Sequence, residues 1–262
     1  MTNYREIFEK VELSLKNYSS LSESDFEDIY GRFKFFENKK LSDDEYFENL
    51  IMIIFYSGFR ASTVSSKEKI ILRYFSDYKK VSQYSDDDFN IIFNDSDMIK
   101  NERKIKSCIK NAATFRDIVI EYKSFKNYID SFNANQSFEK LILLKEELEY
   151  RFEYLGGTTV YHFLTDIGFN VLKPDRVILR IFKRLGLIES EKQLLKTVIQ
   201  GRLFAKATEL PIRYIDIIFV RYGQQGVNEY FGLNNGICLE TSPNCNVCGI
   251  NEYCNYKYNI LK

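Results

Sequence analysis

The stretch from Cys238 to Cys254 reads CLETSPNCNVCGINEYC and holds four cysteines, separated by six, two and five residues. The 262-residue chain has five cysteines in all, and the fifth is Cys108. Four thiolates in one short loop can surround a metal centre without help from the rest of the fold, and thiolate-only sites favour zinc or an iron–sulfur cluster. The single histidine of the chain, His162, adds little to this donor set.

The spacing of these cysteines favours a cluster over a zinc ion. Structural zinc sites usually combine two close Cys-x-x-Cys pairs, whereas this loop has one, Cys245 and Cys248. The wider gaps to Cys238 and Cys254 suit a larger group, and a 4Fe–4S cluster takes four cysteines. Zinc stays the alternative. Residues 1–16 lack the apolar core of a signal peptide, so we expect a cytoplasmic chain without disulfides.

The composition indicates a chain that buries a substantial core and does not span a membrane. Hydrophobic residues make up 45% of it, and no apolar run approaches about twenty residues. Basic and acidic residues balance at 37 each, which argues against a general electrostatic attraction for nucleic acid. Basic stretches over 100–126 and 173–184 are compatible with DNA binding on one face, although a solvated helix face is the simpler explanation of either one. We expect a monomer.

The sequence pattern predicts an all-α fold, because apolar residues recur at helical spacing and alternating segments are absent. Acidic residues before Phe47 mark the start of a buried helix that ends near Gly58. Ser65 or Ser66 is a candidate cap for the next helix. Further helices are expected over residues 103–122 and 138–152. Cys108 lies in the first of these and is expected in the core.

Two glycines interrupt the helices at Tyr154-Leu-Gly-Gly-Thr-Thr159. A glycine pair allows a tight left-handed turn, and Thr158 or Thr159 can cap the following helix, which Gly168 ends. Such a hairpin leaves free backbone amides at the positive end of a helix, where they can hold a phosphate. An ordinary connection between two core helices is the simpler explanation of this segment by itself.

Asp175 follows Gly168 by seven residues, in Lys173-Pro174-Asp175-Arg176, and opens an amphipathic helix. Its simplest role is that of an N-cap. The helix dipole also favours the ionised form of a carboxyl at this position. Beside DNA, a fixed carboxylate could stabilise an oxocarbenium-like sugar, or orient water for attack at the anomeric carbon.

The order of glycine hairpin, short helix, Asp175 and four-cysteine loop resembles the helix-hairpin-helix DNA glycosylase superfamily, which includes endonuclease III and the adenine-mismatch glycosylase. The four cysteines match the 4Fe–4S loop of that superfamily residue for residue, and the interval from Gly168 to Asp175 matches the interval before its catalytic aspartate. The middle of the chain resembles the bacterial 3-methyladenine glycosylase I group, through Phe47-Glu48, Leu50-Ile51, Gly58, Lys104-Ile105, Asn111-Ala112, Gly156, Thr158, Tyr161, Phe163 and Gly168.

The resemblance implies a DNA glycosylase of base excision repair. Such an enzyme flips a damaged base, here an alkylated purine, out of double-stranded DNA and hydrolyses its N-glycosidic bond, with Asp175 as the catalytic carboxylate. It also implies two helical lobes with a DNA-binding cleft. One lobe would comprise residues 41–167, and the other residues 1–40 with 168–262, including the cluster loop at 238–254.

The resemblance also assigns binding residues. Those expected to contact DNA are Gly156, Gly157, Thr158, Thr159, Lys173 and Arg176. The metal ligands would be Cys238, Cys245, Cys248 and Cys254. Aromatic residues that could stack on a flipped base are Tyr56, Phe59 and Tyr161, although buried aromatics more often serve the core.

Departures from the family patterns narrow these expectations. Strand-cleaving members carry a lysine in the first turn after the hairpin, where this chain reads Val160-Tyr161-His162. We therefore expect no AP lyase activity, with Lys173 as a possible source of a weak one. Ile53 and Ala61 stand where the 3-methyladenine glycosylase I group has a base-facing glutamate and a stacking tryptophan. The alternative function is a non-catalytic protein that binds distorted or damaged DNA on the same fold.

Overall fold

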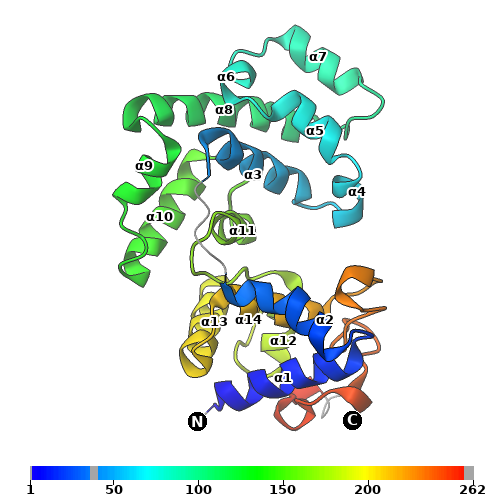
Figure 1. The fold of residues 1–262 in the computed structure, drawn as a ribbon. Coiled ribbons are helices and arrows are strands. Elements are labelled where there is room, and N and C mark those ends of the chain that lie inside the picture. Colours follow the sequence, from blue (N-terminus) through cyan, green and yellow to red (C-terminus); the bar gives the residue numbers. More distant parts are fainter. Residues whose placement is uncertain (1, 36–40, 257–262) are drawn as a thin grey trace. The chain divides into compact units, whose positions relative to one another are not determined.

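The structure, a computed structural model, describes residues 2–35 and 41–256. Helices dominate these residues, which contain no β-strand and a single isolated bridge between Asn228 and Leu233 (Figure 1). The all-α prediction is therefore confirmed. In the same ranges, no helix has both the length and the apolar character needed to cross a membrane.

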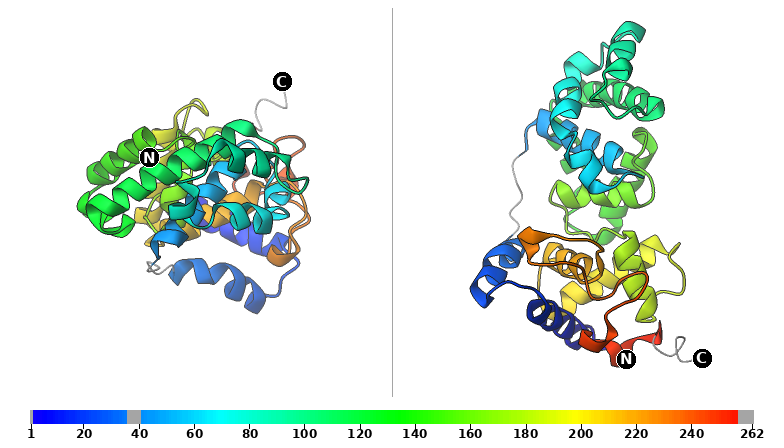
Figure 2. Two further views of the ribbon diagram at one scale, coloured as in Figure 1. Left: turned by 90° about the horizontal axis from the view of Figure 1, so that it is seen from above. Right: turned by 90° about the vertical axis from the view of Figure 1, so that its right-hand side faces the viewer.

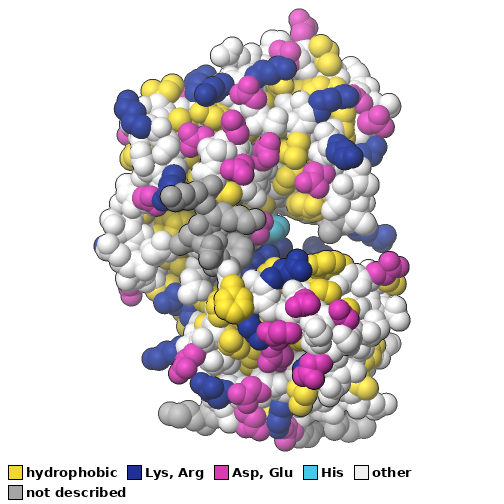
Figure 3. Space-filling view, in the orientation of Figure 1, with side chains coloured by type: hydrophobic (Ala, Val, Ile, Leu, Met, Phe, Trp, Pro, Cys, Tyr) yellow, Lys and Arg dark blue, Asp and Glu magenta, His cyan; other side chains and the backbone are white. Residues whose placement is uncertain are grey.

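The chain divides into two compact units. Among the described residues, the first unit comprises 2–35 and 170–256, and the second comprises 41–169. The predicted lobe boundary at residue 40 adjoins residues 36–40, which lie outside the described ranges. Basic and acidic side chains are interspersed over the face of each unit seen in Figure 3, as the zero net charge leads one to expect.

The first unit packs its helices around an aromatic core. Its helices are α1 (Tyr4–Tyr18), α2 (Glu23–Tyr30), α12 (Arg176–Arg184), α13 (Leu194–Thr208) and α14 (Ile212–Gly223), with 3₁₀ turns η1 (Gly31–Phe35), η2 (Glu229–Phe231), η3 (Cys245–Val247) and η4 (Asn251–Tyr253). The rings of Phe182, Phe204 and Phe219 meet with centroids 5.0–5.4 Å apart. These three residues join α12, α13 and α14, so burial of one aromatic cluster fixes the helix that Asp175 precedes.

The cysteine loop lies beside α1, as Figures 1 and 2 show. The Gly249 N–H donates to Ser14 Oγ at 3.0 Å, and a Cβ at this glycine would stand 2.9 Å from the carbonyl oxygen of Lys10. Only glycine therefore fits this close approach. Asn244 Nδ2 donates to Tyr18 Oη at 3.0 Å, and Lys10 of α1 pairs with Glu252 of the loop. These contacts fix the loop to α1.

The second unit is built around its longest helix. Its helices are α3 (Asp43–Tyr56), α4 (Ala61–Ser65), α5 (Glu68–Phe75), α6 (Tyr78–Val81), α7 (Asp86–Asn94), α8 (Glu102–Tyr122), α9 (Phe125–Ser131), α10 (Phe138–Arg151) and α11 (Thr158–Asp166). Phe115 of α8 stacks on Phe125 of α9 with centroids 4.4 Å apart. Cys108 is fully buried, so its predicted place in the core is confirmed.

Local sequence explains most starts of these helices. Ser42 and Glu45 form a capping box at α3, in which each side chain bonds the backbone N–H of the other. The prediction that Ser65 or Ser66 caps the next helix is wrong. Ser65 ends α4, and α5 starts after Lys67 without a side-chain cap.

Candidate functional site

Asp175 caps α12, as the sequence predicts. Its Oδ1 accepts hydrogen bonds from the backbone N–H groups of Val177 at 2.9 Å and Ile178 at 3.0 Å. Its second oxygen, Oδ2, accepts no hydrogen bond from the described residues. The carboxylate is therefore oriented by its own helix, while one oxygen is left for another partner.

The turn before α12 rests on a second carboxylate. The Asp175 N–H donates to the Lys173 carbonyl at 2.8 Å, and the Lys173 N–H donates to Asp216 Oδ1 at 3.2 Å. Asp216 is 2% exposed, and Arg213 Nη1 donates to its other oxygen at 3.1 Å. Burial raises the pKa of Asp216 to about 6.

Asp216 lies 41 positions after Asp175 in the chain and was not predicted as a site residue. One signal could have drawn attention to it. It stands between Ile215 and Ile217 on the apolar helix α14, and an aspartate is almost never fully buried unless it has a partner.

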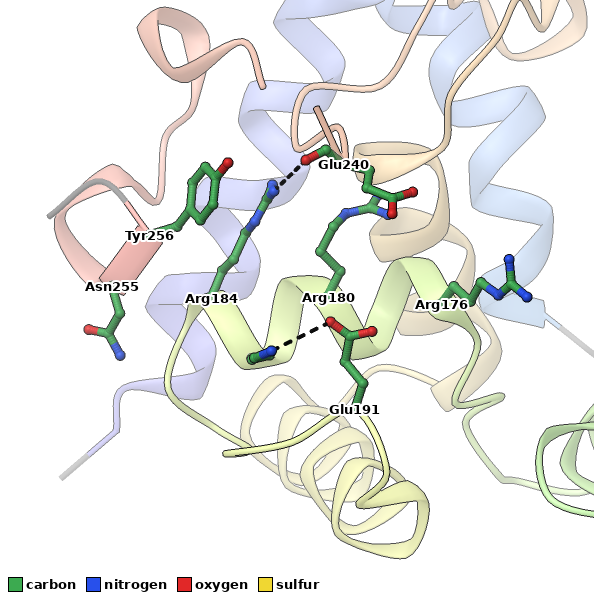
Figure 4. Close-up of a pocket in the computed structure, with 8 residues that line it drawn as sticks. Arg176, Arg180, Arg184, Glu191, Glu240, Asn255 and Tyr256 are labelled. Carbon is green, nitrogen blue, oxygen red and sulfur yellow. Dashed lines mark hydrogen bonds and ion pairs between the residues drawn. The ribbon is translucent and has the colours of Figure 1, made fainter. Parts of the chain in front are cut away.

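Basic side chains follow α12 into a pocket. Arg176, Arg180 and Arg184 occur at four-residue spacing, which places them on one side of the helix. The pocket has a volume of about 300 Å³ (Figure 4), and its lining residues are Arg176, Arg180, Lys183, Arg184, Glu191, Glu240, Asn255 and Tyr256. Arg176 and Lys183 are exposed, so both can meet an anion from solvent.

The two inner arginines attach α12 to the cysteine loop. Arg184 Nη1 donates to Cys238 Sγ at 3.2 Å and to the Leu239 carbonyl at 2.7 Å, and Nη2 donates to the Glu240 carbonyl at 3.0 Å. Arg180 Nη2 donates to the Cys238 carbonyl at 3.1 Å. From the sequence, residues 173–184 were interpreted as a solvated helix face or a DNA-binding surface. Two arginines of this stretch have a further role, because they fix the cysteine loop.

The four cysteines lie in the first unit, and none of them forms a disulfide. Cys238 accepts the Arg184 bond, and Tyr222 Oη donates to Cys248 Sγ at 3.2 Å. His162 lies in the second unit, where Nε2 contacts Asp166 Oδ2 at 3.1 Å. Any metal centre in the loop would therefore rely on the sulfurs.

Thiolate donors like these four suit a zinc ion or an iron–sulfur cluster. Throughout residues 2–35 and 41–256, no three His, Cys, Asp or Glu side chains come close enough to hold one metal ion. A tetrahedral zinc ion needs its ligands to converge at about 2.3 Å. A 4Fe–4S cluster takes four cysteine thiolates, each at a different iron, so its sulfurs lie farther apart. The cluster stays a prediction that the chemistry of these donors supports.

The glycine hairpin connects α10 and α11 in the second unit. Gly157 is the N-cap of α11, with φ 56° and ψ −111°, and no side chain caps the helix. The prediction that Thr158 or Thr159 caps α11 is wrong. The Thr159 hydroxyl contacts the carbonyls of Tyr154 and Gly156 instead, which closes the turn before the helix begins.

The backbone amides of the hairpin are not free, contrary to prediction. The Gly156 N–H donates to Thr159 Oγ1 at 2.9 Å, and the Thr159 N–H donates to the Gly156 carbonyl at 3.1 Å. The Gly157 N–H donates to Glu149 Oε1 at 3.0 Å. Glu149 also pairs with Lys145 of the same helix. A carboxylate from α10 thus occupies the position where an anion would meet the start of α11.

The entry to the hairpin is fixed by α8. The Glu153 N–H donates to Asn111 Oδ1 at 2.9 Å, and Asn111 Nδ2 donates back to the Glu153 carbonyl at 2.9 Å. Lys110 and Ser107 both donate to the Glu153 carboxylate, and these two bonds hold its pKa below the ordinary range. The hairpin therefore starts from a rigid point.

The three aromatic candidates for base stacking differ in exposure. Phe59 is 38% exposed, Tyr56 is half-buried with its hydroxyl 3.0 Å from Ser65 Oγ, and Tyr161 is 3% exposed. Burial favours a packing role for Tyr161. The Lys104 ammonium lies 5.2 Å from the Phe59 ring centroid and donates to the Ile54 and Ser57 carbonyls at the end of α3. Burial lowers the pKa of Lys104 to about 8.

Comparison with known proteins finds a family match for the middle of the chain. The sequence profile of the methyladenine glycosylase family matches residues 37–150. This match confirms the resemblance predicted for that segment. It ends before the hairpin, Asp175 and the cysteines, and so does not bear on them.

Solved structures with a similar fold cover a larger part of the chain. The 8-oxoguanine glycosylase/lyase of Methanocaldococcus jannaschii, solved with a 15mer DNA containing 8-oxoguanine, is 20% identical, with a TM-score of 0.52 over 81% of this chain and 94% of that one. The 8-oxoguanine DNA glycosylase of Thermotoga maritima is 16% identical, with a TM-score of 0.52 over 81% and 95%. The 3-methyladenine DNA glycosylase I of Staphylococcus aureus is 18% identical, with a TM-score of 0.45 over 59% and 91%. The chain shares the fold of the 8-oxoguanine glycosylases.

Proposed function

We propose that this chain is a DNA glycosylase of base excision repair, which flips a damaged base from double-stranded DNA and hydrolyses its N-glycosidic bond. One observation carries the proposal. Asp175 is held through Oδ1 by its own helix, while Oδ2 has no hydrogen bond from the described residues. The matched family profile and the shared fold support the same reaction.

Asp175 is the catalytic carboxylate in this proposal. The two amide bonds at the start of α12 fix its orientation. Oδ2 then stabilises the oxocarbenium-like sugar as the base departs, and orients the attacking water. The C–N bond breaks and its electron pair leaves with the base, the anomeric carbon gains the hydroxyl of water, and the remaining water proton passes through Asp175 to the solvent or the departing base. The products are a free base and an abasic site.

The hairpin and α12 supply the DNA contacts. At the hairpin, a backbone phosphate would replace the Glu149 carboxylate on the Gly157 N–H, since both are anions suited to the start of a helix. Along α12, the exposed Arg176 and Lys183 would bind a second phosphate in the pocket, and Lys173 would add charge. The recessed Arg184 keeps its bonds to the cysteine loop.

The substrate in this proposal is an alkylated purine, and the enzyme is monofunctional. The methyladenine glycosylase match supports the substrate class. The absence of lysine from Thr158 to His162 supports hydrolysis without strand cleavage, because a Schiff base needs an amine. Lys173 is the nearest lysine in sequence to Asp175, and its substitution by glutamine would remove any residual lyase activity.

The four cysteines would hold a 4Fe–4S cluster that stiffens the loop on which α12 rests. Iron and acid-labile sulfide in the purified chain test this directly. We expect four of each per chain, as the cluster formula requires. Cys248→Ser should lose them, and Cys108→Ser, which alters a buried cysteine outside the loop, should keep them. Zinc without sulfide would overturn the cluster proposal.

A base-release assay on a lesion panel tests the function. Duplexes would carry alkylated purines, deaminated bases, oxidised pyrimidines and an adenine mismatch, with alkali added after the reaction to reveal abasic sites. We expect release of an alkylated purine that requires alkali for strand cleavage. Release of another base would correct the substrate, and cleavage without alkali would correct the monofunctional assignment.

A non-catalytic binder of distorted DNA is the alternative. It is favoured by the structural role of Asp175, which serves as the N-cap of α12 whether or not it also takes part in catalysis. Such a protein would bind bent or abasic duplexes tightly and release no base from any substrate. Two observations together would establish this alternative. The unaltered chain would release no base, and Asp175→Asn would leave its DNA binding unchanged.

A further inference from the structure

Asp216 is a carboxylate that packing alone does not explain. It is 2% exposed on α14, between the buried Ile215 and Ile217. Removing a carboxylate from water is costly even when the group is paired, and an apolar residue of similar volume is often as stable or more so. A side chain with this cost is expected to serve a purpose beyond filling space.

Hydrogen bonds connect Asp216 to the backbone of Asp175. Asp216 Oδ1 accepts from the Lys173 N–H at 3.2 Å, and the Lys173 carbonyl accepts from the Asp175 N–H at 2.8 Å. Pro174 stands between them, and its ring restricts φ. The turn before α12 is therefore held at its first residue by Asp216, and at its last residue by the bonds from Asp175 Oδ1 to the helix.

Several charges face Asp216. Arg213 Nη1 donates to its Oδ2 at 3.1 Å, and Lys173 also lies near enough to favour its ionised form. Arg221 interacts with it from the same helix. Asp175 acts in the opposite sense, since its charge repels that of Asp216. The nearby carboxylate of Asp175 therefore adds to the free-energy cost of burying Asp216 in its ionised form.

We propose that Asp216 is a positioning residue for Asp175, which it holds by accepting the Lys173 N–H. This inference rests on the proposed function of Asp175. The amide bonds to Oδ1 fix the side chain, and Asp216 fixes the backbone from which that side chain projects. Together they set the direction of Oδ2, and an error of about 1 Å in such a placement can cost about a hundredfold in rate.

Two substitutions of Asp216 distinguish a positioning role from an effect of its negative charge. Asp216→Asn keeps an acceptor oxygen for the Lys173 N–H, and Asp216→Leu keeps the volume but has no acceptor. We expect the single-turnover rate of base release to fall about 10- to 100-fold in the leucine variant and to stay within about threefold in the asparagine variant. The DNA concentration at half-saturation should be unchanged in both, because neither alteration touches DNA.

Three outcomes would overturn the proposal. The leucine variant could keep the wild-type rate, the asparagine variant could lose as much as the leucine variant, or both could lose DNA affinity together with rate. Arg213→Met provides a further comparison, since it removes the ion pair and leaves the bond to Lys173. Its rate should stay near that of the unaltered chain, and a loss equal to that of Asp216→Leu would assign the effect to charge.

Hydrogen exchange at the Lys173 amide tests the positioning role of Asp216 without an assay of base release. We expect this amide to be protected in the unaltered chain and in Asp216→Asn, and to exchange faster in Asp216→Leu. Should the unaltered chain release no base, the proposed function fails while the exchange result still stands. Equal protection in all three proteins would overturn the positioning role even if the enzyme is active.

Discussion

The starts of α11 and α12 both carry a carboxylate, but they obtain it differently. At α12, Asp175 is the cap residue itself, and its Oδ1 bonds two amides of the helix it begins. At α11, the cap is Gly157, which has no side chain, and the carboxylate comes from Glu149 on the preceding helix. The carboxylate at α12 is part of the residue that caps the helix, whereas the carboxylate at α11 comes from α10.

The two helix starts therefore differ in how easily the bound carboxylate can be exchanged for another anion. Glu149 can leave the Gly157 N–H by rotating its side chain, because no backbone has to move and Lys145 still pairs with it. Asp175 cannot leave without removing the cap of its own helix, which typically costs about 1 kcal/mol. A displaceable anion suits a site for phosphate, and a fixed one suits a catalytic group.

Asp175→Asn should sharpen this contrast with the largest effect. Asparagine caps helices as well as aspartate does, so the melting temperature should change little. Base release should fall by about 10²- to 10⁴-fold, since the negative charge is lost. The matched control is Asp77→Asn, which alters an N-cap aspartate at α6. Equal loss of activity in both variants would contradict a catalytic role for Asp175.

Removing the charge behind the α12 cap should change the pH dependence of stability. The pKa of Asp216 is about 6 in the folded chain, against an ordinary value of 3.8. Between these values the folded state binds a proton that the unfolded state does not, so stability falls as pH rises through this window, by about 1.4 kcal/mol per unit. Asp216→Asn should lack this component, and denaturant curves from pH 4 to 7 measure it. Parallel pH profiles for the two proteins would exclude it.

Gly157→Ala should break the α11 cap. The φ of 56° with ψ of −111° is a conformation that residues with a side chain rarely adopt, and we expect a loss of about 1–3 kcal/mol in the free energy of unfolding. Affinity for DNA should fall with it. Gly156→Ala is the control, because Gly156 has no positive φ and its added Cβ would meet only Glu149 Oε1 at 3.4 Å. Equal losses in the two variants would argue against a special cap.

Glu149→Gln should have the smallest effect, in the opposite direction. It removes the charge that competes with a phosphate for the Gly157 N–H, so DNA affinity should rise about two- to fivefold at low salt, an increment typical of one screened charge. Fluorescence anisotropy with an abasic duplex measures this affinity. Glu146→Gln is the control, since Glu146 also pairs with Lys145 at 2.8 Å but has no bond to the hairpin. An unchanged affinity would indicate that phosphate binds elsewhere.

The fold was largely predictable because its signals are local. The acidic first turn and Ser42 mark the start of α3, and the helical spacing of apolar residues marks α8 and α10. Asp175 was predicted as a cap from the same kind of pattern. The cap of α11 was not, because the Thr159 hydroxyl contacts the carbonyls of Tyr154 and Gly156 in the preceding turn, and residue types alone do not specify that turn.

The candidate site was predictable only in part, because its supporting residues are distant in sequence. Asp216 reaches the Asp175 turn only when α14 packs against α12, and no spacing rule joins positions 173 and 216. Glu149 reaches Gly157 through the path of the hairpin, which residue types do not specify. The metal ligands were suggested by spacing alone, and the bond from Arg184 to Cys238 again depends on tertiary packing.

Helix α12 has a consequence for oxidative damage. It is nine residues long, about 13 Å at 1.5 Å per residue, with Asp175 at one end and Arg184 bonded to Cys238 at the other. An oxidant that converts the Cys238 sulfur to a sulfinic acid changes the partner of Arg184 irreversibly. The chemical state of this one sulfur is therefore coupled, through the partner of Arg184, to the helix that Asp175 caps.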